Sequence, residues 1–172
     1  IIDKRIDFTS GARKATSLER TSKLANKILS KYKFNSKDIL MIFSNSGVNQ
    51  VPVEAALYAK SKKVNVVSII SYDFSKIAPL STINKKLYEI SDIFIDNHIP
   101  AGDSLVTINE QLKVAPGSTI SGAFILNSIL AELAGKLSKE KNIPFYISWN
   151  MPNSKKNNQK LINKFSKKIP HL

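Results

Sequence analysis

The sequence predicts an α/β protein built on a doubly wound, mostly parallel sheet flanked by helices. Two apolar runs, residues 38–43 and 64–70, have the length of strands and lack the alternation that a solvated sheet face imposes. A segment with helical spacing, residues 52–61, lies between them, and a third apolar run follows at residues 93–96. Strands buried on both faces and joined by helices are typical of βαβ units in parallel sheets.

The elements of the first βαβ unit are expected in a regular order. Thr16 with Glu19 three residues later forms a capping-box pattern, and the apolar residues that follow predict a helix over residues 17–32. After the first strand, Pro52 is tolerated in a first helical turn, and the helix that contains it ends near Ser61. The second strand then completes the unit.

Short elements and loops are expected after the second strand. Residues 71–75 are predicted to form its exit loop, and residues 84–90 a short helix before the third strand. Residues 97–117 are predicted to form one long loop. Loops of that length inside compact domains are usually functional or face a ligand, so this segment is a candidate part of a site.

The last third of the chain predicts a long apolar helix. Ser118 or Thr119 can cap it, and it runs to about Ser138 with apolar residues on nearly all sides. Such a helix is expected to be buried in the core or in a subunit interface. Residues 145–147 are expected to add an edge strand, and residues 155–168 a basic terminal helix or a frayed tail.

The amino-acid composition limits which classes of protein and which kinds of functional site are possible. The 172 residues, 42% of them hydrophobic, suffice for a single domain over residues 1–172. The absence of cysteine excludes disulfides and thiolate metal sites, and with two histidines we expect no metal site and no cofactor. No stretch approaches 18 unbroken apolar residues and the amino end is charged, so we expect a cytoplasmic protein without a membrane span.

The net charge of +13 raises the hypothesis of nucleic-acid binding. Of the 26 basic residues, however, three are arginine and the other 23 are lysine, whereas nucleic-acid recognition favours the fixed fork of arginine. The lysines are also spread along the whole chain. Solvated helix faces therefore account better for the charge, and a nucleic-acid-associated protein is the weakest functional hypothesis.

The turn after the first strand is the clearest candidate site. In an open parallel sheet, ligands bind where the carboxyl ends of the strands meet helix amino termini. Two hydroxyls, two amide side chains and a glycine make an uncharged phosphate cradle there: Ser44, Ser46, Asn45, Asn49 and Gly47. The turn lacks both the nucleotide P-loop pattern and the GxGxxG pattern. From the residues alone, a purely structural turn remains the alternative, because these residue types also form ordinary turns.

The stretch ILMIFSNSGVNQVPVEAALYAKSKKVNVVSIISYDFSK resembles the core of the SIS (sugar isomerase) family of phosphosugar isomerases and phosphosugar-binding proteins. In that family a strand, a serine-x-serine-glycine turn, a helix and a second strand follow in this order. The likeness is closest to an uncharacterised branch, through SNSG-x-N-x-VP-x-E at residues 44–54, KKLYE at 85–89 and IDN-x-x-P-x-GD around 96–103. The resemblance implies a flavodoxin-like three-layer sandwich.

The resemblance also implies which residues bind a sugar phosphate. In the family, the turn after the first of these strands wraps the phosphate, which carries over to residues 44–47 and to Asn49. The exit of the second strand adds hydroxyl groups, which correspond to Ser71 and Ser75. A phosphorylated sugar is therefore the expected ligand.

Further candidates lie outside the turn. The GST sequence at residues 117–119 resembles the entry into the long helix of that branch, which adds Ser118 and Thr119 to the expected binding residues. Isomerisation needs a base that moves a proton between adjacent carbons. Glu54 and His98 are the candidates, with a helix-stabilising carboxylate and an ordinary loop histidine as the alternatives.

One feature of the family is missing. Its members carry upstream dimerising helices and an earlier strand whose Gly/Ser/His-rich loop helps to form the sugar site, and nothing before Ser10 matches them. The sequence nevertheless predicts a homodimer or higher homo-oligomer that binds a phosphorylated sugar. Two activities stay open, an isomerase or related enzyme and a non-catalytic phosphosugar sensor.

Overall fold

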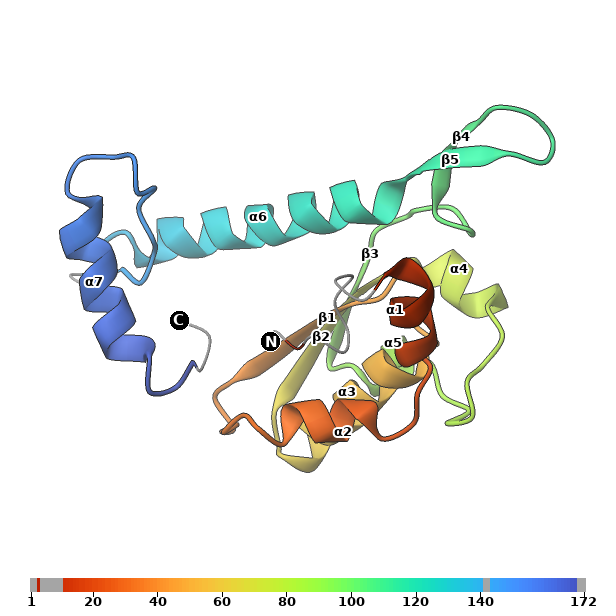
Figure 1. Cartoon of the computed structure of the whole chain (residues 1–172), viewed down its shortest axis with the longest axis horizontal. Coiled ribbons are helices and arrows are strands. Elements are labelled where there is room, and N and C mark those ends of the chain that lie inside the picture. Colours follow the sequence, from red (N-terminus) through yellow and green to blue (C-terminus); the bar gives the residue numbers. More distant parts are fainter. Residues whose placement is uncertain (1–2, 4–10, 141–142, 170–172) are drawn as a thin grey trace. The chain divides into compact units, whose positions relative to one another are not determined.

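The computed structural model describes residue 3 and residues 11–140 and 143–169. The chain divides into two compact units, Ile1–Ala123 and Phe124–Leu172 (Figure 1). The first unit contains the sheet and the candidate site, and the second contains most of the long helix and the terminal helix. That residues 1–172 form a single domain stays a prediction.

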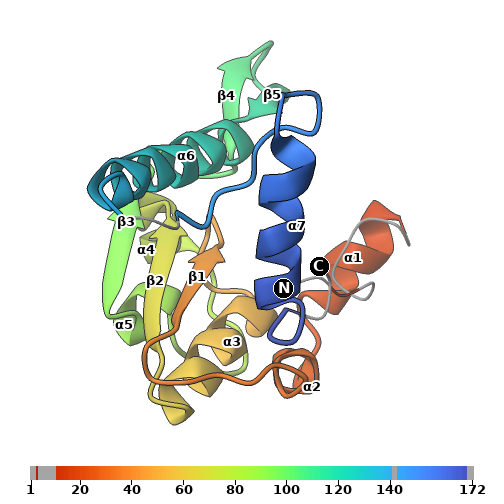
Figure 2. The ribbon, with the colours of Figure 1, turned by 90° about the vertical axis from the view of Figure 1, so that its left-hand side faces the viewer.

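A three-stranded parallel sheet forms the centre of the first unit. Its strands, in spatial order, are β1 (Ile39–Phe43), β2 (Asn65–Ile70) and β3 (Ile93–Asp96). Ile42 pairs with Ser68, and Ser68 pairs with Phe94, so the three carboxyl ends lie at the same end of the sheet (Figure 2). The predicted α/β fold, with a parallel sheet flanked by helices, is confirmed.

The helix predicted over residues 17–32 is wrong in its boundaries. Two short helices stand in its place: α1 (Ala12–Leu18) and α2 (Leu24–Leu29). Glu19 ends α1 instead of lying in a first turn, and Lys23 has a φ of 64°, a left-handed conformation that separates the two helices. The break depends on a distant residue, because the Lys23 N–H donates a 2.8 Å hydrogen bond to the Glu54 carboxylate.

The core lies between one face of the sheet and the helices α2, α3 (Gln50–Ser61) and α5 (Leu87–Ile90). It consists of ten buried apolar residues: Leu29, Leu40, Ile42, Val53, Ala56, Ala59, Val64, Val66, Ile70 and Leu87. Helix α3 begins two residues before Pro52, and α5 is shorter than the predicted helix over residues 84–90. The alternate strand side chains Ile39 and Phe43 are exposed, so β1 is buried on one face only.

The exit of β2 is helical, which corrects the prediction of a loop at residues 71–75. Helix α4 (Tyr72–Ile77) begins there because Ser71 caps it, with the Phe74 N–H donating to the Ser71 hydroxyl oxygen at 3.2 Å. Serine is among the residues that favour this cap position. The capping signal was present in the sequence, but a helix of six residues is too short to show apolar periodicity.

The long loop predicted at residues 97–117 contains an antiparallel hairpin, β4 (Ser104–Thr107) and β5 (Lys113–Pro116). Asn109 closes its turn, because the Asn109 side-chain oxygen accepts hydrogen bonds from the N–H groups of Gln111 and Leu112. The third strand is also less buried than predicted, since Ile93 is 59% exposed.

The long apolar helix is α6 (Gly117–Leu137). By length and composition alone, with a mean hydropathy of 1.3, it could cross a membrane. Within the part of α6 that belongs to the first unit, Gly117 and Gly122 are buried and Ile120 is 68% exposed, and burial of the rest of α6 in the core stays a prediction. Helices α2, α3 and α5 already fill the core face of the sheet. Burial of α6 in a subunit interface stays a prediction.

The terminal helix is α7 (Ser154–Phe165), shorter than predicted. The edge strand predicted at residues 145–147 is wrong, because these residues have no strand partner among the described residues. The buried side chain of Asn158 binds the Ile147 backbone instead, accepting from its N–H at 3.0 Å and donating to its carbonyl at 2.7 Å.

Candidate functional site

The turn between β1 and α3 has the geometry of an anion cradle. Gly47 has a φ of 64°, the left-handed conformation that glycine adopts at little cost. Within the described part of the chain, no hydrogen bond uses the backbone N–H groups of residues 45–50 or the hydroxyls of Ser44 and Ser46. Free N–H groups at the start of a 12-residue helix carry partial positive charge and favour an anion.

The exit of β2 supports this turn from behind. The Ser71 N–H donates to the Asn45 carbonyl at 2.8 Å, and Ser71 and Ser75 are 1% and 0% exposed. A Cβ at Gly47 would lie 3.2 Å from the Ser75 hydroxyl oxygen and 3.3 Å from Ile70 Cγ2. Both the backbone conformation and the close packing therefore require glycine at this position.

Two buried polar atoms at the turn have no partner among the described residues, Asn45 Nδ2 and Ser75 Oγ. The Asn45 amide is oriented by the Asn97 Nδ2 group, which donates to Asn45 Oδ1 at 2.9 Å. An unsatisfied buried polar group costs about 1–3 kcal/mol, so such groups commonly mark positions where a polar ligand or solvent binds. This observation is independent of the free N–H groups.

Two cavities open on the turn. The larger, of about 930 Å³, runs along β1 and is lined at the turn by Ser44, Asn45, Ser46 and Asn49. The smaller, of about 460 Å³, extends from Ser46 and Asn49 to residues 78–82. Both volumes are in the range of small-molecule sites. Four expected binding residues line neither cavity: Gly47 within the turn, Ser71 and Ser75 beneath it, and Thr119.

Glu54 holds two segments together. Its Oε1 atom accepts hydrogen bonds from the Lys23 N–H at 2.8 Å, the Gln50 side-chain amide at 2.9 Å and the Ser22 hydroxyl at 3.2 Å. Glu54 lines neither cavity, and its Oε2 atom is buried without a partner among the described residues. These contacts are those of a carboxylate that fixes α3 against the start of α2.

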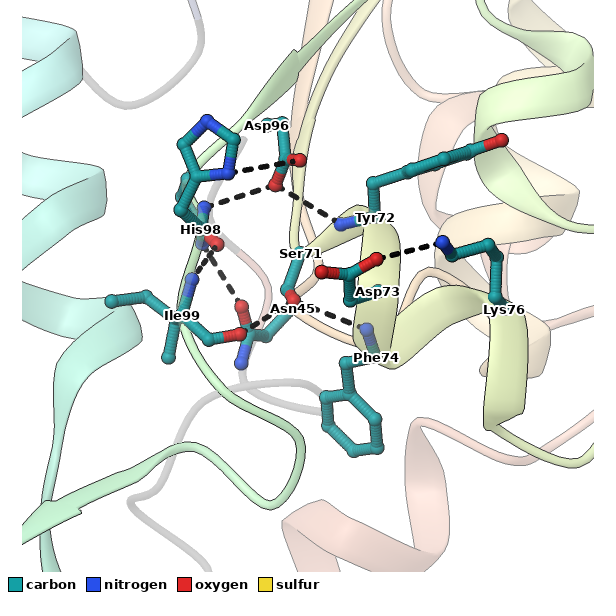
Figure 3. Close-up of polar contacts among 10 residues, drawn as sticks. Asn45, Ser71, Tyr72, Asp73, Phe74, Lys76, Asp96, His98 and Ile99 are labelled. Atoms are coloured by element: carbon teal, nitrogen blue, oxygen red, sulfur yellow. Dashed lines mark hydrogen bonds and ion pairs between the residues drawn. The ribbon is translucent and has the colours of Figure 1, made fainter.

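His98 lies just beyond the end of β3 (Figure 3). Its backbone N–H donates to the Asp96 carboxylate at 2.9 Å, and its ring Nδ1 atom lies 3.3 Å from that carboxylate. Asp96 also accepts from the Tyr72 N–H at 3.1 Å, which joins β3 to α4. The His98 side chain is 84% exposed and lines neither cavity.

Next to His98, Asp73 and Lys76 form a 2.7 Å ion pair. This contact lowers the pKa of Asp73 and raises the pKa of Lys76.

Ser118 reaches the larger cavity, whereas Thr119 is exposed and lines neither cavity. The N–H and the hydroxyl of Ser118 both donate to the Asp103 carboxylate, with a distance of 2.7 Å for the N–H. Asp103 therefore fixes the start of α6 and places a carboxylate on the cavity wall.

The sequence pattern did not identify two residues of the site. Glu19 lines the larger cavity, and its Oε1 atom accepts a 2.9 Å hydrogen bond from the Asn49 side-chain amide. Arg20 lines both cavities. The capping-box pattern placed Glu19 inside a helix, and no local pattern brings residues 19–20 to a turn 25 residues further on. A long-range contact decides their position.

Comparison with known proteins agrees with the resemblance seen in the sequence. A family model described as an SIS domain matches residues 1–71. A UPF0309 protein of Brucella anthropi is 37% identical over 168 residues, which cover 97% of this chain and 69% of the relative. UPF0309 proteins of Brucella canis and Brucella suis are each 36% identical over 168 residues, with the same coverage.

Proposed function

This chain belongs to the UPF0309 family and carries an SIS domain over residues 1–71, and from this premise we propose that it binds a phosphorylated sugar at the turn between β1 and α3. The observation that carries the proposal is the row of free N–H groups at residues 45–50. A phosphate group can accept from several such groups at once, in a place where the helix dipole also favours negative charge.

The shape of the site supports a ligand larger than phosphate. The hydroxyls of Ser44 and Ser46 and the amides of Asn45 and Asn49 are placed to bind the phosphate or the first sugar hydroxyls. The remaining volume of the larger cavity extends along β1, where Met41 and Phe43 line it. A sugar carbon chain attached to the phosphate fits this combination of a polar end and a partly apolar wall.

We propose an isomerase or related enzyme as the activity of this site. Proton transfer between adjacent carbons needs a carboxylate or an imidazole near the sugar. Among the described residues that line the larger cavity, Glu19 and Asp103 are the carboxylates. They fit this role better than Glu54 and His98, which lie outside both cavities.

A second candidate function, a non-catalytic phosphosugar sensor, is favoured by one observation. Glu19 and Asp103 already accept hydrogen bonds from protein groups, Asn49 and Ser118 respectively. A carboxylate held in this way can orient a ligand without taking its proton. Turnover of the sugar phosphate that binds best separates the two candidates, because a sensor binds it without converting it.

The binding proposal predicts selective stabilisation by phosphosugars. In a thermal-shift screen of hexose, pentose, heptose and amino-sugar phosphates, a ligand at 100 times its Kd adds ~2.7 kcal/mol to the free energy of unfolding. For a protein of this size, the Tm rises by about 5–10 °C. Each matching unphosphorylated sugar is the control and is expected to give no shift. Equal shifts with and without the phosphate, or no shift with any phosphosugar, would contradict the proposal.

We also propose that the protein acts in the cytoplasm as a homo-oligomer. Helix α6 supports an interface, because Ile120, Phe124 and Leu133 are exposed on it by 68%, 73% and 44%. Apolar surface of this kind is usually covered by a partner. Light scattering at micromolar concentration is expected to give at least twice the 19.1 kDa mass of the chain. A monomeric mass would contradict the oligomer.

A further inference from the structure

Arg20 lies where the two cavities of the site meet. The cavities share four lining residues: Arg20, Ser46, Asn49 and Phe74. Among the described lining residues of either cavity, Arg20 is the only one with a positive charge. Arg20 therefore lies near Ser46 and Asn49, the two turn residues that line both cavities.

The guanidinium group of Arg20 is held in place and keeps free donors. Its Nη1 atom donates to the Thr16 carbonyl at 2.7 Å and to Glu19 Oε1 at 2.8 Å. Glu19 Oε1 in turn accepts from the Asn49 side-chain amide, which ties the arginine to the turn. Among the described residues, none accepts a hydrogen bond from Nε or Nη2 of Arg20, so these donors remain available to a ligand.

The charges around the cavities explain why a cation is needed. Glu19 and Asp103 place carboxylates on the wall of the larger cavity, and they repel an anionic ligand. The amino end of α3 contributes only about half a positive charge. A guanidinium group offsets this repulsion and can donate two parallel hydrogen bonds to one phosphate group.

The smaller cavity provides a second, independent indication of a polar ligand. Ser81 lines this cavity, and its buried hydroxyl has no hydrogen-bond partner among the described residues. Ser81 and Arg20 both line this smaller cavity. A ligand group that reaches this side of the turn would meet both the cation and the hydroxyl.

We propose that Arg20 binds the phosphate of the ligand at the junction of the two cavities, together with the amino end of α3. This inference rests on the proposed function, because it names the charged residue of the same site. It makes Arg20 the residue that favours doubly charged phosphate over uncharged or singly charged groups. Arg20 also connects α1 to the turn through Glu19.

The test compares the Kd of inorganic phosphate and of fructose 6-phosphate, by calorimetry at low salt, for the unmodified protein and three variants. Arg20→Ala is expected to weaken both ligands by about 10- to 100-fold, the loss of one strong charged hydrogen-bonding group. Arg20→Lys keeps the positive charge but lacks the planar guanidinium group, so it is expected to lose less affinity for both ligands than Arg20→Ala. Arg13→Ala, an exposed arginine on α1 outside both cavities, is the matched control and is expected to bind normally.

The outcomes separate this inference from the proposed function. Binding by the unmodified protein with an unchanged Kd in Arg20→Ala would overturn the role of Arg20 and leave the phosphate cradle standing. Failure of the unmodified protein to bind inorganic phosphate and every phosphosugar of the thermal-shift screen would overturn both. If another phosphosugar of that screen binds, it replaces fructose 6-phosphate in the comparison. If circular dichroism shows that Arg20→Ala is unfolded, the Kd of Arg20→Gln is measured in its place. An unchanged Kd in Arg20→Gln would overturn the role of Arg20, and a weaker affinity would support it.

Discussion

A protein that carries Ser44→Ala together with Ser46→Ala is expected to lose detectable phosphosugar binding while keeping its fold. Both hydroxyls line the larger cavity and neither bonds to another described residue, so their removal costs the folded protein little. Each hydrogen bond to a charged phosphate contributes about 1.5–3 kcal/mol. The loss of two corresponds to more than about 100-fold in Kd.

This prediction is checked by calorimetry with the phosphosugar that gives the largest thermal shift. Ser30→Ala is a matched control, because Ser30 is exposed, lies outside both cavities and uses its hydroxyl to donate to the Lys27 carbonyl. It is expected to bind like the unmodified protein. A folded double variant with unchanged affinity would refute the placement of the phosphate at this turn.

Glu54→Ala is expected to destabilise the protein by about 2–3 kcal/mol without removing a group from the cavities. The substitution deletes the acceptor of three hydrogen bonds, from Lys23, Ser22 and Gln50, and a bond to a charged group contributes about 1.5–3 kcal/mol. The left-handed turn at Lys23 loses its partner, so α2 separates more easily from α3. The free energy of unfolding in urea measures this effect.

Two further variants test whether the role of Glu54 is structural or catalytic. Glu132→Ala removes an exposed carboxylate whose ion pair with Lys136, on the same helix, contributes about 0.3–0.5 kcal/mol, so it is expected to change stability little. Glu54→Gln keeps a hydrogen-bond acceptor, so its free energy of unfolding is expected to lie between those of Glu54→Ala and Glu132→Ala. If Glu54→Gln were as stable as the unmodified protein but lost phosphosugar turnover, Glu54 would be catalytic and the structural role would be wrong.

The strands and the serine-rich turn could be predicted because their causes are local. Each strand of the parallel sheet is a short run of apolar residues, and the predicted and observed bounds of β1, β2 and β3 differ by at most one residue. Gly47 adopts the left-handed conformation that its lack of a side chain permits. Helix α3 follows directly, so the sequence alone places its amino end against the turn.

Two of the errors occur where a residue outside the element changes the local preference. Thr16 and Glu19 match a capping box, yet Glu19 binds Asn49 and the chain turns at Lys23 to reach Glu54. Likewise, residues 145–147 have strand-like composition, but Asn158 occupies the backbone groups of Ile147 that a neighbouring strand would use. Local propensity does not include hydrogen bonds between residues that are 11 to 31 positions apart, as these are.

The α/β class, the order of the strands along the chain and the serine-rich turn can be derived from the amino-acid sequence alone, because they follow from apolar runs, helical spacing and one glycine in a turn. The side chains that surround that turn depend on how distant segments pack in the folded protein. This packing brings Arg20 and Asp103 to the cavities and leaves Glu54 and His98 outside them. A site is a set of positions in space, and packing between segments far apart in the chain fixes those positions.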